Sequence, residues 1–213
     1  MTSLTNKDQI NARRRLKRHI RAIATVDEHV AAGVELCGFP EPRLRDRGFA
    51  TFLSIIVSQQ VSTEAAASIW NKVCLAFPTM EPKTIAHCKP EKLRAAGLSG
   101  RKVEYAQGLA ASILEGTFCP DQLPEMSDED AIAHIVAQRG FGNWSAEIYL
   151  MFSLQRKDIF AADDLALLIA LQRLKGLRER PTGKEAREIV AHWAPHRTAG
   201  SLFLWHYYRG APT

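Results

Sequence analysis

The sequence IAHIVAQRGFGNWSAEI (residues 132–148) contains two helical patterns separated by a very short turn. Apolar residues recur at helical spacing from Ile132, and a second helix is expected to open at Asn143. The turn Gly140-Phe141-Gly142 is too tight for three ordinary side chains, and its glycines permit a positive φ and a close approach of the backbone. Backbone amides at the start of the second helix would point outward, where they can bind an anion such as a phosphate.

Three interpretations of this glycine turn differ in function. A helix-hairpin-helix would use its amides to hold a DNA phosphate without reading a base. An ordinary αα-hairpin would use the glycines only for packing, and the residues alone leave this interpretation open. The string G-x-G-x-x-S also resembles a dinucleotide fingerprint, but a helical stripe rather than a strand precedes it, which argues against that interpretation.

Helical periodicity extends through the rest of the chain. One buried helix face is predicted by residues at i, i+3, i+4, i+7 and i+8, namely Phe49, Phe52, Leu53, Ile56 and Val57. Start signals for further helices are Ser62, Ser99, Ser127 and the capping-box pair Thr182 and Glu185. Later helices are expected around 144–152, 167–174 and 198–208. Because no alternating run predicts a strand, the expected fold class is all-α.

The composition is that of an ordinary globular chain. Its 213 residues are 46% hydrophobic and 24% charged, which excludes collagenous, low-complexity and disordered classes. Apolar runs end well before the ~18–20 residues that a membrane span needs, and the N-terminus lacks a signal-peptide core. We therefore expect a protein that is not secreted and does not associate with a membrane. The four cysteines show no C-x-x-C pairing, so free thiols are expected at Cys37, Cys74, Cys88 and Cys119.

The net charge of +5 is concentrated in one short segment. Six basic residues and no acid lie between Asn11 and Arg21, which leaves the rest of the chain close to neutral. A solvated helix face and a phosphate-contacting surface explain this segment equally well. DNA binding by the folded body would therefore depend on a local patch and on backbone amides rather than on a strong overall field.

The chain resembles the helix-hairpin-helix DNA glycosylases and, within them, the alkylbase branch of type II 3-methyladenine glycosylases. Five segments carry the resemblance in the family's order: Phe49–Trp70, Gly97–Ala110, Gly140–Leu154, Asp158–Leu167 and Arg197–Tyr208. The resemblance implies one glycosylase unit over residues 1–213. Within it, a barrel-like lobe over 46–163 would contain the hairpin, residues 1–45 and 164–213 would form a second helical lobe, and a base-binding cleft would lie between the two lobes.

The resemblance places the catalytic aspartate shortly after the hairpin, at Asp164. Adjacent side chains diverge by about 100° around a helix, so Asp163 and Asp164 cannot both face one pocket. We expect Asp163 to cap the helix and Asp164 to be the catalytic group. A fixed carboxylate stabilises the oxocarbenium-like sugar that forms as a base leaves. Without the family, capping and solvation would explain both aspartates.

The position of the catalytic lysine in bifunctional relatives corresponds to Trp144. The resemblance therefore implies a monofunctional enzyme that leaves an abasic site and an uncut strand. No cysteine follows Cys119, so the four-cysteine pattern of the iron–sulfur members is missing, and neither a metal nor another cofactor is expected.

The resemblance also implies the residues that contact the base. Trp144 and Trp205 match aromatic positions of the alkylbase pocket, and Ile148 stands where some relatives have a further aromatic. The electron-rich face of a tryptophan favours a cationic methylated purine over a neutral base. The remaining two tryptophans, Trp70 and Trp193, are expected in the core.

Further positions are expected to contact DNA. The intercalating residue of the family, which fills the space left by a flipped base, corresponds to Gln60, with Gln59 beside it. A hydrogen-bonded turn between two helices is the alternative for this pair. Around the hairpin, the expected DNA-binding residues are Gly140, Phe141, Gly142, Asn143 and Ser145.

These expectations describe a glycosylase that flips and excises 3-methyladenine and 7-methylguanine from double-stranded DNA in base-excision repair. Two alternatives are a glycosylase for another damaged base, such as ethenoadenine or hypoxanthine, and a non-catalytic DNA-binding or damage-sensing module. The protein would act as a monomer, in the cytoplasm or nucleoid of a prokaryote or in the nucleus of a eukaryote.

Overall fold

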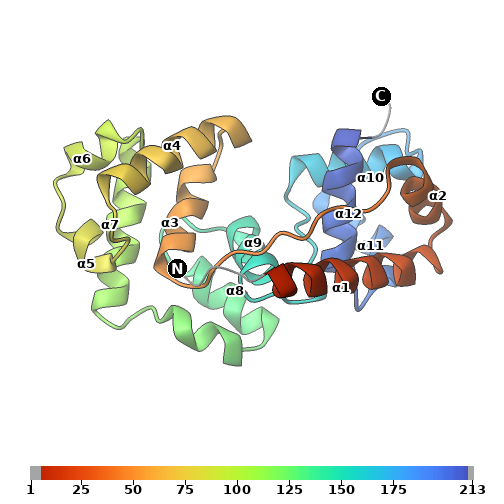
Figure 1. Cartoon of the computed structure of the whole chain (residues 1–213), viewed down its shortest axis with the longest axis horizontal. Coiled ribbons are helices and arrows are strands. Elements are labelled where there is room, and N and C mark those ends of the chain that lie inside the picture. The colour runs from red at the N-terminus through yellow and green to blue at the C-terminus, as the bar shows by residue number, and fades with distance from the viewer. Residues whose placement is uncertain (1–5, 211–213) are drawn as a thin grey trace. The chain divides into compact units, whose positions relative to one another are not determined.

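The computed structural model describes residues 6–210, which form helices and connecting loops without any strand (Figure 1). The α-helices are α1 (Asn6–Ala24), α2 (Glu28–Cys37), α3 (Phe49–Ser58), α4 (Thr63–Ala76), α5 (Pro82–Ala86), α6 (Pro90–Ala95), α7 (Gly100–Leu114), α8 (Asp128–Val136), α9 (Asn143–Phe152), α10 (Leu165–Lys175), α11 (Gly183–Ile189) and α12 (Arg197–Gly210). Two 3-10 helices are η1 (Pro120–Glu125) and η2 (Ala191–Trp193). The all-α expectation is confirmed for these residues. The first five residues, part of the N-terminus in which no signal peptide is expected, lie outside them.

The chain forms two compact units. The central unit is Arg45–Tyr149, and the terminal unit contains the described residues up to Leu44 and from Leu150 on. The expected second boundary, after residue 163, differs from this division. Residues 150–163 belong to the terminal unit because their loop is bonded to α12: Thr198 Oγ1 donates to the Arg156 carbonyl at 2.7 Å and accepts from the Ile159 amide at 3.0 Å.

The central unit is organised around α3. Phe52 on this helix is fully buried and stacks on Tyr149 with 3.9 Å between the ring centres. Phe118 and Phe141 meet the Phe52 ring edge-on at 5.3 and 5.6 Å. At the other end of α3, Lys102 Nζ on α7 donates to the Val57 carbonyl at 2.8 Å, where the helix dipole favours a cation.

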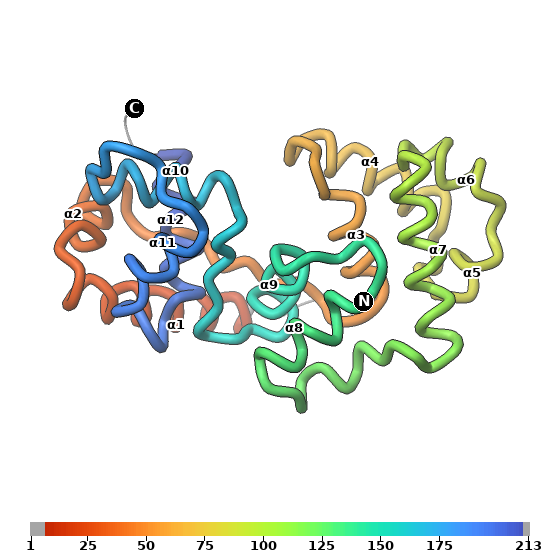
Figure 2. Tube along the Cα trace, turned by 180° about the vertical axis from the view of Figure 1, so that it is seen from behind, coloured from red at the N-terminus to blue at the C-terminus, as the bar shows by residue number. Residues whose placement is uncertain are grey.

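The terminal unit brings the two ends of the chain together. Helices α1 and α2 pack beside α12, and α2 also packs on α10 (Figure 2). The side chain of Asp27, at the start of α2, is fully buried. It accepts hydrogen bonds from Lys175 Nζ at 2.5 Å, Trp193 Nε1 at 2.6 Å and His192 Nε2 at 3.0 Å. One buried carboxylate therefore connects α2 to the end of α10 and to η2.

Most of the predicted helix starts are confirmed by side-chain caps. The cap residues that accept a backbone N–H are Ser62, Ser99, Ser127 and Thr182, and Glu185 completes the capping box. Of the two tryptophans expected in the core, Trp193 is buried but Trp70 is only half-buried. The prediction for Trp70 is wrong because α4 packs mainly against α3, which leaves Val73 as the one buried residue of this helix.

Much of the basic segment in α1 is used within the terminal unit. Arg13 Nε donates to Glu41 Oε2 at 2.9 Å, and Arg15 donates to Gln155 Oε1 at 2.5 Å. Lys17 and Arg21 lie over the Phe39 ring at 5.4 and 5.5 Å. Four of the six basic side chains thus have partners inside the protein, which explains their clustering without any ligand.

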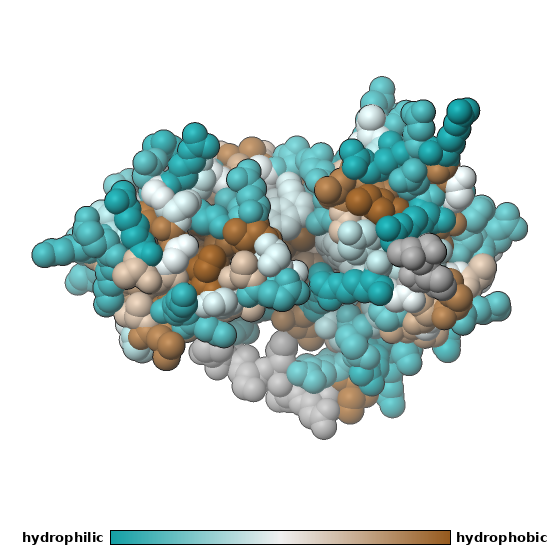
Figure 3. Space-filling model, turned by 90° about the horizontal axis from the view of Figure 1, so that it is seen from above, coloured by the Kyte–Doolittle hydropathy of each residue, from teal (hydrophilic) through white to brown (hydrophobic). Residues whose placement is uncertain are grey.

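Hydrophobic residues on the face shown in Figure 3 occur as separate patches among hydrophilic ones. None of the helices described in residues 6–210 has the length and apolarity to cross a membrane. The four cysteines are free and half-buried, as expected. The same residues contain no group of three or more His, Cys, Asp or Glu side chains arranged to hold a metal ion.

Candidate functional site

In the turn between α8 and α9, only one of the two glycines stands where a larger residue would collide with its surroundings. Gly140 has a φ of +93°, and a Cβ atom there would lie 2.3 Å from the Tyr105 ring on α7. Gly142 has no atom within 4 Å of the corresponding position and no positive φ. The expectation that both glycines permit positive φ therefore holds for Gly140 alone. Gly142 is exposed and leaves open space at the start of α9.

Two residues that were expected to contact DNA have buried side chains instead. Phe141 is 7% exposed because its ring rests on Phe52, and Ser145 is 3% exposed. Both side chains anchor the turn, so only their backbone could face a ligand. Asn143 is exposed at the helix start. The first helical hydrogen bond runs from the Ala146 amide to the Gly142 carbonyl, and the Phe141 amide donates to the Gln138 carbonyl. The N–H groups of the first helical turn have no partner within the helix itself.

The structure separates the roles of the two glutamines that follow α3. Gln59 Nε2 donates to the Gly140 carbonyl at 2.9 Å and to Ser145 Oγ at 3.3 Å, so it ties α3 to the turn. This contact fits the turn-stabilising alternative for Gln59. Gln60 is exposed and has a φ of 54°, in the left-handed region that side chains other than glycine seldom adopt. At the end of α3, the side-chain amide of Gln59 is therefore bonded inside the central unit, whereas the side chain of Gln60 is exposed to solvent.

The difference between the two glycines predicts different stabilities for matched alanine variants. Gly140→Ala should lower the free energy of unfolding by about 2–5 kcal/mol, because it adds left-handed strain and forces the Tyr105 ring to move. Gly142→Ala should cost at most about 1 kcal/mol, the usual effect of alanine at a helix start. Urea unfolding of both variants measures these values. Equal losses would contradict the assigned role of Gly140.

Two of the expected base-contacting residues lie on α9 in the central unit. Trp144 is half-buried in the first turn, and Ile148 is 4% exposed. Their spacing of four residues places them on one face of the helix. This face starts directly after the exposed turn.

Asp164 is the N-cap of α10, whereas Asp163 is exposed and caps nothing. The expectation that Asp163 caps the helix is therefore wrong. The helix begins at Leu165, one residue later than that assignment requires, so the carboxylate of Asp164 reaches the Leu167 amide at 3.1 Å. The helix dipole favours a negative charge at this end. The candidate catalytic group is thus held by backbone at a defined position.

The indole of Trp205 also holds Asp164. Trp205 on α12 is 7% exposed, and its Nε1 donates to Asp164 Oδ1 at 3.1 Å. Phe152 lies 5.8 Å from the Trp205 ring centre, and the Arg43 guanidinium lies 5.1 Å from it. Asp164, the expected catalytic group, and Trp205, an expected base-contacting residue, are therefore in contact within the terminal unit. Arg43 was not expected, because no local pattern marks a residue that reaches α12 from a loop more than a hundred positions earlier.

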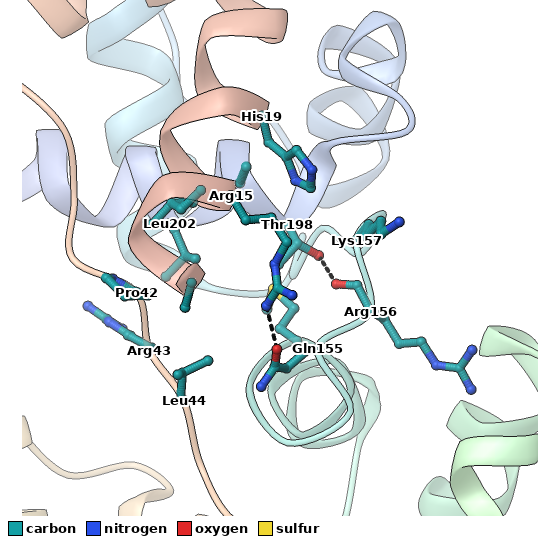
Figure 4. Close-up of a pocket in the computed structure, with 14 residues that line it drawn as sticks. Arg15, His19, Pro42, Arg43, Leu44, Gln155, Arg156, Lys157, Thr198 and Leu202 are labelled. Atoms are coloured by element: carbon teal, nitrogen blue, oxygen red, sulfur yellow. Dashed lines mark hydrogen bonds between the residues drawn. The ribbon is translucent and has the colours of Figure 1, made fainter. Parts of the chain in front are cut away.

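A cavity in the terminal unit is lined by basic, apolar and uncharged polar side chains without an acidic one (Figure 4). Arg15 crosses this cavity to Gln155. His19 lines it and stacks on His196 with 4.6 Å between the ring centres. Burial, together with His196 and nearby cations, lowers the pKa of His19 to about 4. This ring is therefore neutral near pH 7 and packs as an apolar group.

The described residues thus form a helical protein in which a glycine-containing turn joins α8 to α9, and Asp164 caps the next helix, α10. The family model for the HhH-GPD superfamily base excision DNA repair proteins matches residues 53–196. The chain therefore belongs to this superfamily, and the resemblance noted in the sequence is confirmed.

Proteins that are similar to this chain include 3-methyladenine glycosylases. The Schizosaccharomyces pombe DNA-3-methyladenine glycosylase 1 is 29% identical over 192 residues, which cover 86% of this chain and 83% of the relative. A Bacillus subtilis relative is 30% identical over 161 residues, and the chain spans only 56% of its length. The solved structure of the S. pombe 3-methyladenine DNA glycosylase in complex with abasic DNA has a TM-score of 0.82 at 27% identity, covering 88% of this chain and 95% of that one.

Proposed function

We propose that the protein is a monofunctional DNA N-glycosylase that excises alkylated purines, such as 3-methyladenine and 7-methylguanine, from double-stranded DNA. The observation that carries this proposal is the Asp164 carboxylate, which is held between the Leu167 amide and the Trp205 indole N–H. A carboxylate fixed in this way acts without reorganising during the reaction. No metal or other cofactor takes part in the proposed reaction.

The proposed chemistry needs one fixed anion and water. As the bond between the sugar C1′ and the base nitrogen breaks, the electron pair leaves with the base and positive charge develops on the sugar. Asp164 stabilises this charge, and a water molecule then adds to C1′ and releases a proton. A base that is already cationic leaves as a neutral purine, so a strong general acid is not needed.

Aromatic residues supply selectivity in this proposal. Trp205, which bonds Asp164 within the terminal unit, contacts the extrahelical base in this proposal. A tryptophan face attracts a cationic ring more strongly than a neutral one. Because tryptophan cannot form a Schiff base with the sugar, Trp144 at the lysine position of bifunctional relatives leaves the DNA strand uncut.

The hairpin binds the DNA backbone in the same proposal. The exposed start of α9, at Gly142 and Asn143, contacts a phosphate through backbone amides. Gln60 fills the space that the extruded base leaves in the duplex. Gln59 supports both elements from inside, since it bonds the turn to the end of α3.

Base release from methylated duplex DNA tests the proposed function. The free bases are resolved by chromatography, and the DNA is analysed for strand breaks with and without an alkali step. We expect 3-methyladenine and 7-methylguanine in the supernatant and strand breaks only after alkali. Breaks without alkali would contradict the monofunctional reaction, and release of only ethenoadenine or hypoxanthine from matching substrates would reassign the lesion. Duplex binding without release of any base would indicate a damage-sensing module.

Gln60→Gly is expected to reduce excision from duplex DNA by about tenfold and to change excision from single-stranded DNA by less than about twofold. Only the duplex leaves a gap that the side chain must fill. Glycine adopts the φ of 54° without strain, so the variant removes the side chain and keeps the backbone. Initial rates on the two substrates measure the ratio. The matched control is Gln122→Gly, at an exposed glutamine in η1, and an equal loss on both substrates would refute the role of Gln60.

A further inference from the structure

Arg43 places a positive charge on the aromatic side chains of the candidate site. This exposed residue lies on the extended segment between α2 and α3 (Figure 4). Its guanidinium carbon is 5.1 Å from the Trp205 ring centre and 5.8 Å from the Phe152 ring centre. Both distances are within the range of a cation–π interaction. All three residues belong to the terminal unit.

Trp205 connects this cation to the candidate catalytic carboxylate. The same indole interacts with Arg43 through its ring and donates from Nε1 to Asp164 at 3.1 Å. Trp205 is only 7% exposed and Phe152 only 2%, whereas Arg43 is exposed. Arg43 is therefore an exposed cation placed against a buried aromatic surface. The ring that it contacts is the one whose N–H holds Asp164.

A cationic purine has to compete with Arg43 for this surface. The ring attracts both groups through the same quadrupole, and two positive charges a few ångströms apart repel each other. A neutral purine stacks on tryptophan without that repulsion. The presence of Arg43 therefore weakens binding of a cationic ring more than binding of a neutral ring of the same shape.

We infer that Arg43 is a specificity-determining residue, which occupies the cation-accepting surface of Trp205 and reduces the preference of the site for cationic over neutral purines. The inference rests on the proposed function, because it concerns the same purine site. In this role, Arg43 affects which bases the site accepts and does not take part in the chemical step. A site with this arginine therefore discriminates less between cationic and neutral lesions than the tryptophan alone would.

Nucleoside binding tests the role of Arg43 without requiring catalysis. The probes are 7-methylguanosine, whose methylated ring is cationic near pH 6, and guanosine as its neutral counterpart. Arg43→Gln should lower the Kd for 7-methylguanosine by about three- to tenfold and change the Kd for guanosine by less than about twofold. Arg43→Lys should behave as the wild type. The matched control is Arg173→Gln, which removes an exposed arginine that lies 5.5 Å from the Tyr208 ring centre.

The outcomes separate this inference from the proposed function. A gain for the cationic nucleoside in Arg43→Gln alone supports the inference, whether or not the protein releases bases from DNA. Unchanged or weaker binding of 7-methylguanosine overturns it, even if methylated bases are released from DNA. An equal gain for both nucleosides overturns it as well, because Arg43 would then act only as a steric cover.

Discussion

Asp164→Asn is expected to reduce the release of methylated purines by about 10²- to 10³-fold while duplex binding stays within about threefold of the wild type. The loss follows because a neutral amide cannot balance the positive charge that develops on the sugar. The scaffold around the residue should persist. Asparagine is a good N-cap, and its carbonyl oxygen can accept from the Leu167 amide and the Trp205 indole as the carboxylate does.

The measurement is single-turnover base release, with duplex affinity and urea unfolding recorded on the same samples. Asp163→Asn is the matched control, since Asp163 is the exposed neighbour and caps nothing. It should retain the wild-type rate within about twofold. Equal rates for Asp164→Asn and the wild type would remove Asp164 from the catalytic role, and a large loss in Asp163→Asn would move that role to its neighbour.

Asp27→Asn should lower the free energy of unfolding by about 3–5 kcal/mol near pH 7, because it removes the buried charge partner of the half-buried Lys175. Burial alone would raise the pKa of Asp27, but hydrogen bonds from Lys175, Trp193 and His192 lower it from 3.8 to about 2. A difference of this size corresponds to about 2–3 kcal/mol. The carboxylate therefore stabilises the fold above about pH 4, and this contribution disappears as the pH falls from about 4 to 2.

Urea unfolding at a series of pH values tests both parts of this prediction. The wild type should lose stability between about pH 4 and 2 more steeply than Asp27→Asn, which lacks the titrating group. The control is Glu41→Gln, which removes the exposed ion pair with Arg13 and should cost less than about 1 kcal/mol. Parallel pH curves for the wild type and Asp27→Asn would rule out the proposed contribution.

The helices were largely predictable from local sequence. The stripe that includes Phe52 and Ile56 corresponds to α3, and Ser62, Ser99 and Ser127 cap the helices that they were expected to start. These features depend on residues within one or two turns, so spacing alone reveals them. The all-α class follows from the same local signals.

The residues of the candidate site could be predicted from the sequence, but their roles could be predicted only in part. Asp164, Trp205 and Gln60 came from the resemblance to a family, and no local rule would have selected them. The helix start at Leu165 assigns the cap to Asp164 rather than Asp163, because one residue of register decides which carboxylate reaches the Leu167 amide. Phe141 and Ser145 were expected to contact DNA, yet both side chains are buried, and they contact Phe52 and Gln59 respectively.

Periodicity and capping depend on near neighbours in the chain, so the sequence by itself determines the helices and the hairpin. Contacts between distant positions cannot be found in this way. Tyr105 beside Gly140, Lys175 and Trp193 on Asp27, and Arg43 over Trp205 each join helices or loops that lie far apart in the chain. Such pairs depend on how whole helices pack. For that reason the tertiary structure alone determines which glycine is needed, which acid is buried and which cation covers the candidate site.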